Sequence, residues 1–216
     1  MGIRNDVFGL EQIYQLQIEG QWSTKGDVWL TPSPFLAPAG TDFGYIAGGY
    51  AGSYPSPSTT VDRIDYSNDT ATASPKGPLT AGASYTNGVS SLTHGYAIGG
   101  KDSGDLSIVS RIDFANDTAN SLTRGPLSDT RYRGGATGNE DFGYAGGGTV
   151  GGSSPKSLVD RIDYSNETAT AVPKGPLTAN RYHIGAAGNA NFGYFAGGNP
   201  GPLSTCLLYT SPSPRD

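Results

Sequence analysis

The chain has 216 residues, including 33 Gly and 15 Pro, and its formal net charge is −5. Charged residues make up only 15% of it, too few to keep it extended by self-repulsion, and 13 Tyr and 7 Phe supply large groups to bury, which favours a turn-rich all-β protein. Because neither a basic stripe nor a long apolar run occurs, we expect no nucleic-acid partner and no membrane partner.

Residues 1–40 form an N-terminal segment outside any repeat, and their pattern supports two interpretations. Alternating apolar residues around Tyr14 suit a strand, whereas Val7, Leu10 and Tyr14 suit one face of a helix. The segment shows no continuous apolar stretch of the secretory-signal type.

From residue 41 to residue 204 the chain repeats three markers with a period of 48 to 51 residues. They are triplets of the Phe-Gly-Tyr type at Phe43, His94, Phe142 and Phe192, Arg-Ile-Asp at Arg63, Arg111 and Arg161, and Gly-Pro-Leu at Gly77, Gly125 and Gly175. This region is therefore predicted to consist of successive copies of one structural unit.

The distances between markers are constant except in one interval. Each Arg lies 14 residues before its Gly-Pro-Leu, that Gly lies 17 before the next Phe-Gly-Tyr position, and 6 more reach the second Gly of a Gly pair. The interval from this pair to the following Arg varies, being 14, 11 and 13 residues. Because loops tolerate insertions and paired strands do not, residues 50–60, 101–109 and 149–158 are predicted to be loops.

One unit is predicted to contain four short strands. Residues 181–188 and 191–198 are the first two, residues 157–164 the third and residues 168–172 the fourth. Asn166 and its neighbours suit a tight turn between the last two. Pro173 is expected to end the pairing, because proline cannot donate to a ladder.

Four antiparallel strands in about 50 residues, with a Gly pair before a variable loop, resemble a blade of a kelch-type β-propeller. The Gly pairs are Gly48, Gly49, Gly99, Gly100, Gly147, Gly148, Gly197 and Gly198. Arg131 and Arg181 match the Arg that opens a kelch strand, whereas Ala83 does not. Departures also occur where such repeats carry Tyr-Asp and Trp, at Ile64-Asp65 with Ala71, Ile112-Asp113 with Ala119, and Ile162-Asp163 with Ala169.

This resemblance covers about residues 42–198 and implies a propeller fragment with about three and a half blades. In such a fold the first strand of each blade lines a crowded axis, and the first strands here, such as residues 183–188, are rich in small residues. The alternative is a β-solenoid fibre, in which we would expect shorter rungs.

The Arg and Asp of each Arg-Ile-Asp triplet have two interpretations. They could present a charged ladder to a ligand, or they could pair with each other or with a neighbouring unit as part of the framework. Recurrence in every unit favours a structural role. The pairs are Arg63 and Asp65, Arg111 and Asp113, and Arg161 and Asp163.

The sequence predicts a protein without catalytic, cofactor or metal sites. Kelch-type propellers include copper-radical oxidases, whose site requires a Cys-modified Tyr and His ligands, but this chain has one cysteine, Cys206, and two histidines, His94 and His183, in different units. His94 replaces Phe in its marker, which favours a structural role. No HExxH motif, phosphate loop or Ser-His-Asp motif occurs.

The variable loops are the candidate binding sites. They combine Tyr, Ser, Gly and Pro, the adaptable composition of recognition loops, although an inert surface loop has the same composition. The candidate ligand-binding residues are Tyr50, Tyr54, Asp102, Asp105, Ser153 and Ser154.

The last eleven residues, Cys206–Asp216, can be reverse-translated into a transposase adapter used in preparing sequencing libraries. We therefore interpret residues 205–216 as an adapter-derived scar on a truncated reading frame; the alternative is a genuine Pro/Ser-rich tail.

Gly-rich, degenerate repeats of this wording resemble virion structural proteins of tailed phages, especially tail or fibre components. The resemblance implies a non-enzymatic protein of the virion that has other virion proteins as partners and binds a host-surface glycan or protein through its variable loops. Residues 1–40 would then attach it to the particle. Two alternatives remain: a cellular kelch-like scaffold that binds protein, and the non-catalytic portion of a truncated carbohydrate-active enzyme.

Overall fold

The computed structural model describes residues 43–51, 56–200 and 206–210, so the expectations for residues 1–40 and for Tyr54 lie outside the described residues. It is built of antiparallel strands and short 3-10 helices, which confirms the all-β prediction. The first sheet contains β1 (Phe43–Ala47), β2 (Val61–Asp65) and β3 (Ser74–Pro75). The second contains β4 (Asn87–Ser90), β5 (His94–Ile98), β6 (Val109–Asp113) and β7 (Leu122–Arg124).

The third sheet contains β8 (Gly135–Gly138), β9 (Phe142–Gly146), β12 (Val159–Asp163) and β13 (Val172–Lys174). The fourth contains β14 (Gly185–Gly188), β15 (Phe192–Ala196) and β16 (Cys206–Thr210). A small hairpin, β10 (Thr149–Val150) with β11 (Ser154–Pro155), projects from the third sheet. The 3-10 helices are η1 (Tyr66–Asn68), η2 (Phe114–Asn116) and η3 (Tyr164–Asn166).

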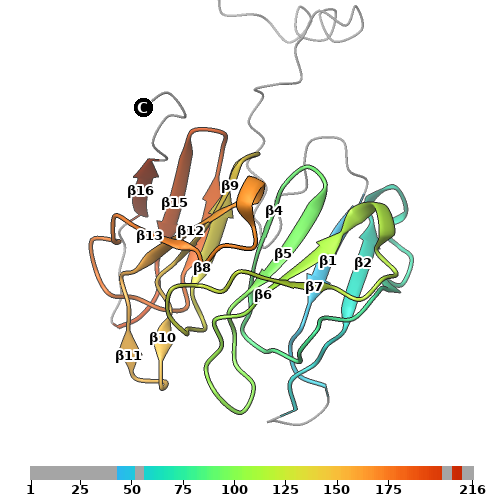
Figure 1. Cartoon of the computed structure of the whole chain (residues 1–216), viewed down its shortest axis with the longest axis horizontal. Coiled ribbons are helices and arrows are strands. Elements are labelled where there is room, and N and C mark those ends of the chain that lie inside the picture. The colour runs from blue at the N-terminus through green and yellow to red at the C-terminus, as the bar shows by residue number, and fades with distance from the viewer. Residues whose placement is uncertain (1–42, 52–55, 201–205, 211–216) are drawn as a thin grey trace, which may run out of the picture.

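The sheets lie in chain order across the molecule, with the first sheet at one side and the fourth at the other (Figure 1). The first strands of the second, third and fourth sheets lie next to one another, since β8 contacts both β4 and β14. The approach of β8 to β14 is so close that a Cβ atom on Gly188 would collide with Thr137, which explains the small residues there.

The constant marker spacing corresponds to a constant strand register. Phe43 is paired with Asp65, His94 with Asp113 and Phe142 with Asp163, so each Phe-Gly-Tyr position faces the end of its Arg-Ile-Asp strand. The variable intervals lie outside these ladders, in the connections that precede β2, β6 and β12.

The predicted fourth strand, residues 168–172, is wrong in its position. The chain leaves the third strand through η3 and a further turn in which the Ala169 N–H donates to the Asn166 carbonyl, so pairing begins only at Val172. Pro173 does not end this strand but lies within it, opposite Asp160. Strand β13 is at the edge of the sheet and pairs only with β12. The N–H that Pro173 lacks is therefore not needed for a hydrogen bond to a further strand.

The other strands are shorter than predicted, for backbone reasons. The first strand of the last unit begins at Gly185 rather than at residue 181, because His183 has φ of 53°, which interrupts an extended chain. The second ends at Ala196, because both members of every Gly pair have positive φ, between 60° and 107°. The Gly pairs therefore end these strands and direct the chain into the variable loops.

The hydrophobic core lies between the sheets. One cluster joins the first and second sheets through Tyr45 and Ile112, a second joins the second and third through Tyr96 and Ile162, and a third joins the third and fourth. In the third, Phe195 is fully buried among residues of both sheets. Each sheet is therefore held in place by its neighbours.

The segment expected to be adapter-derived occupies the third-strand position of the last unit. Strand β16 pairs with β15 so that Thr210 faces Phe192, the place that Asp163 holds opposite Phe142. Cys206 and Leu207 accordingly hold the register positions of Val159 and Asp160.

Candidate functional site

Three residues with left-handed backbone occupy one repeat position beside the variable loops. They are Tyr85, Arg133 and His183, with φ of 54°, 60° and 53°. Backbone hydrogen bonds connect them, since the Arg133 N–H donates to the Tyr85 carbonyl at 3.4 Å and the His183 N–H to the Arg133 carbonyl at 2.6 Å. Non-glycine residues in this conformation are strained and concentrate at functional sites, so this row is a candidate for one.

What we call the aromatic strip is formed by Tyr85 and Arg133 of the row, by Tyr132 next to Arg133, and by Tyr50 of the first variable loop. The rings of Tyr50 and Tyr85 meet edge to face at 5.7 Å, and those of Tyr85 and Tyr132 lie 5.8 Å apart. The Arg133 guanidinium lies 4.5 Å from the ring centre of Tyr85 and 5.0 Å from that of Tyr132. The strip thus combines ring faces with a cation.

Exposure differs along the aromatic strip. The side chain of Tyr85 is exposed and those of Tyr50 and Arg133 are half-buried, whereas Tyr132 is buried beneath them. Exposed His183 and half-buried Tyr182 extend the strip, with ring centres 5.0 Å apart. A ligand on this face would therefore meet Tyr85, Arg133 and His183, with Tyr132 as support.

The strip has a distinct electrostatic character. The hydrogen-bonding Arg133 and, after it, Tyr50 lower the pKa of Tyr85. Burial and then the charge of Arg133 lower the pKa of His183, so this imidazole is neutral at neutral pH. The positive charge of the strip is therefore that of Arg133.

The second variable loop supports the strip. Lys101 Nζ lies 4.9 Å from the ring centre of Tyr132 and 2.8 Å from Asp105 Oδ1. The other oxygen of Asp105 accepts a hydrogen bond from the Gly151 N–H in the third loop. Burial works to raise the pKa of Asp105, but these hydrogen bonds outweigh it and lower the pKa. Asp105 therefore fixes two loops to each other.

The candidate ligand-binding residues divide accordingly. Tyr50 belongs to the aromatic strip and Asp105 braces it, whereas Asp102 accepts a hydrogen bond from the Gly104 N–H within its own loop. Ser153 and Ser154 are exposed on the hairpin of the third loop.

A buried ion pair lies beside Gly148, in the Gly pair of the third sheet. Arg131 Nη2 is 3.0 Å from Asp160 Oδ2 and donates to the Ala145 carbonyl, and the side chains of both charged residues are almost wholly buried. Burial lowers the pKa of Arg131, and the Asp160 charge opposes the shift. Ser128 also donates to Asp160, at 2.7 Å. In the preceding unit the corresponding residues are Ala83, Ser110 and Thr80. None of them is charged, so both members of the ion pair are replaced there by neutral residues.

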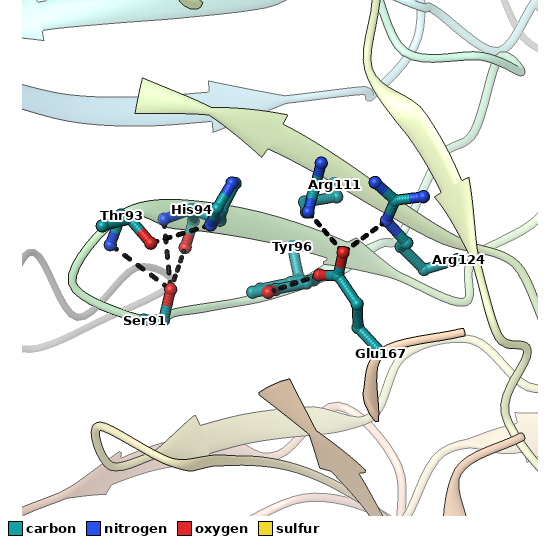
Figure 2. Close-up of polar contacts among 7 residues, drawn as sticks. All are labelled: Ser91, Thr93, His94, Tyr96, Arg111, Arg124 and Glu167. Carbon is teal, nitrogen blue, oxygen red and sulfur yellow. Dashed lines mark hydrogen bonds and ion pairs between the residues drawn. The ribbon is translucent and has the colours of Figure 1, made fainter. Parts of the chain in front are cut away.

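At the opposite end of the strands, an acidic residue of one unit joins the preceding unit. Figure 2 shows the Glu167 carboxylate between Arg111 and Arg124, with Arg124 Nε at 2.7 Å and the Tyr96 hydroxyl donating to its other oxygen at 2.8 Å. The ring of Tyr164 stacks on that of Tyr96 at 4.8 Å. We call this arrangement, one carboxylate bound by a Tyr, an Arg and a further basic residue, the acidic clasp.

The same clasp occurs between the first and second sheets. Asp117 Oδ2 is 2.8 Å from Arg63 and 3.0 Å from the Tyr45 hydroxyl, and Asp117 Oδ1 is 3.4 Å from Lys76. Phe114 stacks on Tyr45 at 4.9 Å. The two copies use the same repeat positions, although the basic residues and the Tyr divide the two carboxylate oxygens differently, so the clasp is a repeated joint between sheets.

The Arg-Ile-Asp pairs therefore do not bind each other. Arg63 and Arg111 reach the carboxylate of the next unit, while Asp65, Asp113 and Asp163 each accept a hydrogen bond at 2.9 Å from the backbone N–H two residues on, which caps the 3-10 helix. The Arg161 guanidinium lies 4.3 Å from the ring centre of Phe142.

His94 is the first residue of β5. Its Nδ1 is 2.8 Å from Thr93 Oγ1, and its backbone N–H donates to Ser91 Oγ (Figure 2). Burial and then the charge of Arg111 lower its pKa. Within the part of the chain that the structure describes, no three His, Cys, Asp or Glu side chains form a group able to hold a metal ion, and no helix is long and apolar enough to cross a membrane.

Tyr85, Tyr132 and Arg133 were not predicted from the sequence. They directly precede the small-residue strands, whose composition is explained by packing alone. A usable signal was that Tyr85, Arg133 and His183 stand at one repeat position yet are large. The clasp acids, which lie six residues after each Arg at Asp69, Asp117 and Glu167, were not predicted either.

No protein-family model matches the chain, and no curated protein matches it.

Proposed function

We propose that this protein is a non-enzymatic binding protein whose repeat region is a propeller-type domain, and that its loop face binds carbohydrate through the aromatic strip. The domain assignment is supported by the contacts of β8 with both β4 and β14 and by the matching register of successive sheets. The resemblance of the repeats to tailed-phage virion proteins makes a host-surface glycan the ligand class that we favour.

The observation that carries the binding proposal is the strained row of Tyr85, Arg133 and His183 on one face. Sugars present flat patches of C–H groups that pack on aromatic rings, and hydroxyl groups that accept hydrogen bonds from guanidinium. Tyr85 offers an exposed ring and Arg133 a fork of donors beside it. Tyr132, held by Lys101 and Arg133, keeps this surface rigid, which lowers the entropy cost of binding.

Screening of the full chain on a glycan array, followed by titration of the best saccharide, tests the proposal. We expect Tyr85→Ala to weaken binding roughly tenfold or more, the effect of losing a central aromatic contact. Tyr66→Ala is the matched control, because Tyr66 is 55% exposed and follows the far end of β2. The proposal fails if no saccharide binds, or if the two variants weaken binding equally. Capture of a protein ligand that depends on Tyr85 would instead support a protein-binding scaffold.

A further inference from the structure

Arg133 is a cation on the loop face that pairs with no carboxylate among the described residues. The groups that raise its pKa are tyrosines, first Tyr85 through a hydrogen bond, while burial opposes the shift. Its guanidinium lies over the rings of Tyr85 and Tyr132. Four other arginines each pair with an Asp or Glu side chain: Arg63, Arg111, Arg124 and Arg131. The surroundings of Arg133 therefore differ from theirs in lacking an anion.

Carboxylates near the loop face are already bound by other basic groups. The three pairs are Asp105 with Lys101, Asp129 with Lys156, and Asp160 with Arg131. His183, on the other side of Arg133 from Tyr85, adds no charge at neutral pH, because burial and then the Arg133 charge lower its pKa. Among these groups, Arg133 thus carries the one positive charge without a counter-ion, in a chain whose formal net charge is −5.

The guanidinium of Arg133 is held in position on this face before a ligand arrives. The residue has φ of 60°, and the guanidinium lies 4.5 Å from the ring centre of Tyr85 and 5.0 Å from that of Tyr132. A guanidinium carries five N–H donors around the edge of its plane, so contacts with rings and the hydrogen bond to Tyr85 leave donors for a further acceptor. Because the side chain is already ordered, an acceptor that binds it loses little affinity to ordering.

We propose that the saccharide bound by the aromatic strip is acidic, and that its carboxylate or sulfate ester binds Arg133 while a sugar ring packs on Tyr85. This inference rests on the proposed carbohydrate-binding function and names the class of saccharide. A singly charged acid group matches the single cation, and two parallel N–H···O bonds to it are stronger than bonds to a sugar hydroxyl. His183, neutral and exposed beside Arg133, can exchange hydrogen bonds with the hydroxyl groups of the same sugar.

A neutral saccharide fits this face less well. Arg133 is half-buried, and a sugar ring lying on Tyr85 would remove more water from the neighbouring guanidinium. Withdrawing a charge from water costs free energy unless a counter-charge or good hydrogen bonds replace the water. An acid group on the saccharide supplies both, whereas hydroxyl groups supply only hydrogen bonds. Charge should therefore decide between saccharides of otherwise equal shape.

A glycan array that carries carboxylated, sulfated and neutral forms of the same backbones tests this on the full chain. It includes 3′-sialyllactose with its carboxyl methyl ester, and 6′-sulfolactose with lactose. We expect an acidic form to bind roughly tenfold more tightly than its neutral counterpart at low ionic strength. Added salt should narrow this difference, because it screens the charge of Arg133. The carboxylated and sulfated members show which acid group the site prefers.

Substitutions then assign the preference to Arg133. Arg133→Gln should remove the preference for the acidic form, whereas Arg133→Lys, which keeps the charge without the fork, should retain part of it. Arg161→Gln is the matched control: Arg161 is also half-buried over a ring, 4.3 Å from the ring centre of Phe142, but at the other end of the strands. It should leave the preference unchanged.

The outcomes separate this inference from the proposed function. Equal binding of acidic and neutral forms, with both dependent on Tyr85, overturns the inference and leaves carbohydrate binding in place. Absence of binding to every saccharide overturns both. A preference for the acidic form that survives Arg133→Gln, or that Arg161→Gln removes equally, also overturns the assignment to Arg133. The paired saccharides and the salt series use the unsubstituted chain, so these comparisons hold even where a variant fails to fold.

Discussion

The acidic clasps and the aromatic strip use the same residue types for different ends. In a clasp, the Tyr96 ring is stacked and its hydroxyl donates to the Glu167 carboxylate, which also pairs with Arg111 and Arg124. In the strip, the Tyr85 ring is exposed and is flanked by the cation of Arg133. Tyrosine and arginine thus have a structural role where they bind a carboxylate of the next unit. Where they bind no carboxylate, as at Tyr85 and Arg133, they can contact a ligand.

Backbone geometry separates the two regions further. The clasp residues lie in regular strands and capped 3-10 helices, whereas the strip includes residues with left-handed φ. The clasps therefore stabilise the joints between sheets. Part of this stability offsets the backbone strain of the residues with left-handed φ in the strip.

The largest effect should come from the buried ion pair beneath the loop face. Asp160→Ala leaves the Arg131 guanidinium buried without its counter-ion and should lower the free energy of unfolding by about 3–5 kcal/mol. The double variant Arg131→Ala with Asp160→Ser reproduces the Ala83 and Ser110 arrangement of the preceding unit, and should lose less. Chemical denaturation of both measures this, and a double variant less stable than Asp160→Ala would contradict it.

The clasp itself should have an intermediate effect. Glu167→Gln keeps the shape but removes the charge that Arg111, Arg124 and Tyr96 share, and should cost about 1–3 kcal/mol. Asp69→Asn is the matched control: this acid holds the same repeat position but is exposed, so the change should stay within about 0.5 kcal/mol. Thermal unfolding of the two variants decides; equal losses would show that the clasp contributes no stability.

Alkaline titration should distinguish the two groups of tyrosines. Burial, and then the hydrogen bond to Asp117, raises the pKa of Tyr45 to about 12 from the ordinary value of 10.0. A raised folded-state pKa means that this contribution to stability is complete below pH 10 and disappears as the pH rises to about 12. Tyr85, whose pKa Arg133 lowers, should ionise first and without unfolding. Phenolate absorbance followed together with circular dichroism would test this; unfolding that precedes the first ionisation would contradict it.

The sequence predicted the repeat and its strands well because register depends on counting, and the spacing from Arg63 to Gly77 is invariant through all three units. It placed the fourth strand wrongly because Thr168 and Thr170, which have good β propensity, lie in the turn and the short connection that follow the 3-10 helix. It could not connect Glu167 to Arg111, because the two lie in different units and only the packing of the sheets brings them together.

The smallest effect should appear at the strained row, and its sign is informative. Tyr85 has φ of 54°, a conformation that costs a non-glycine residue about 1–2 kcal/mol and costs glycine little. Tyr85→Gly should therefore be more stable than Tyr85→Ala by up to about 1 kcal/mol, although both remove the ring and both should weaken saccharide binding roughly tenfold or more. Differential scanning calorimetry compares them directly. An alanine variant as stable as the glycine variant would mean that the left-handed backbone stores no strain. The exposed ring of Tyr85 would then be the only feature of this residue that favours a functional role.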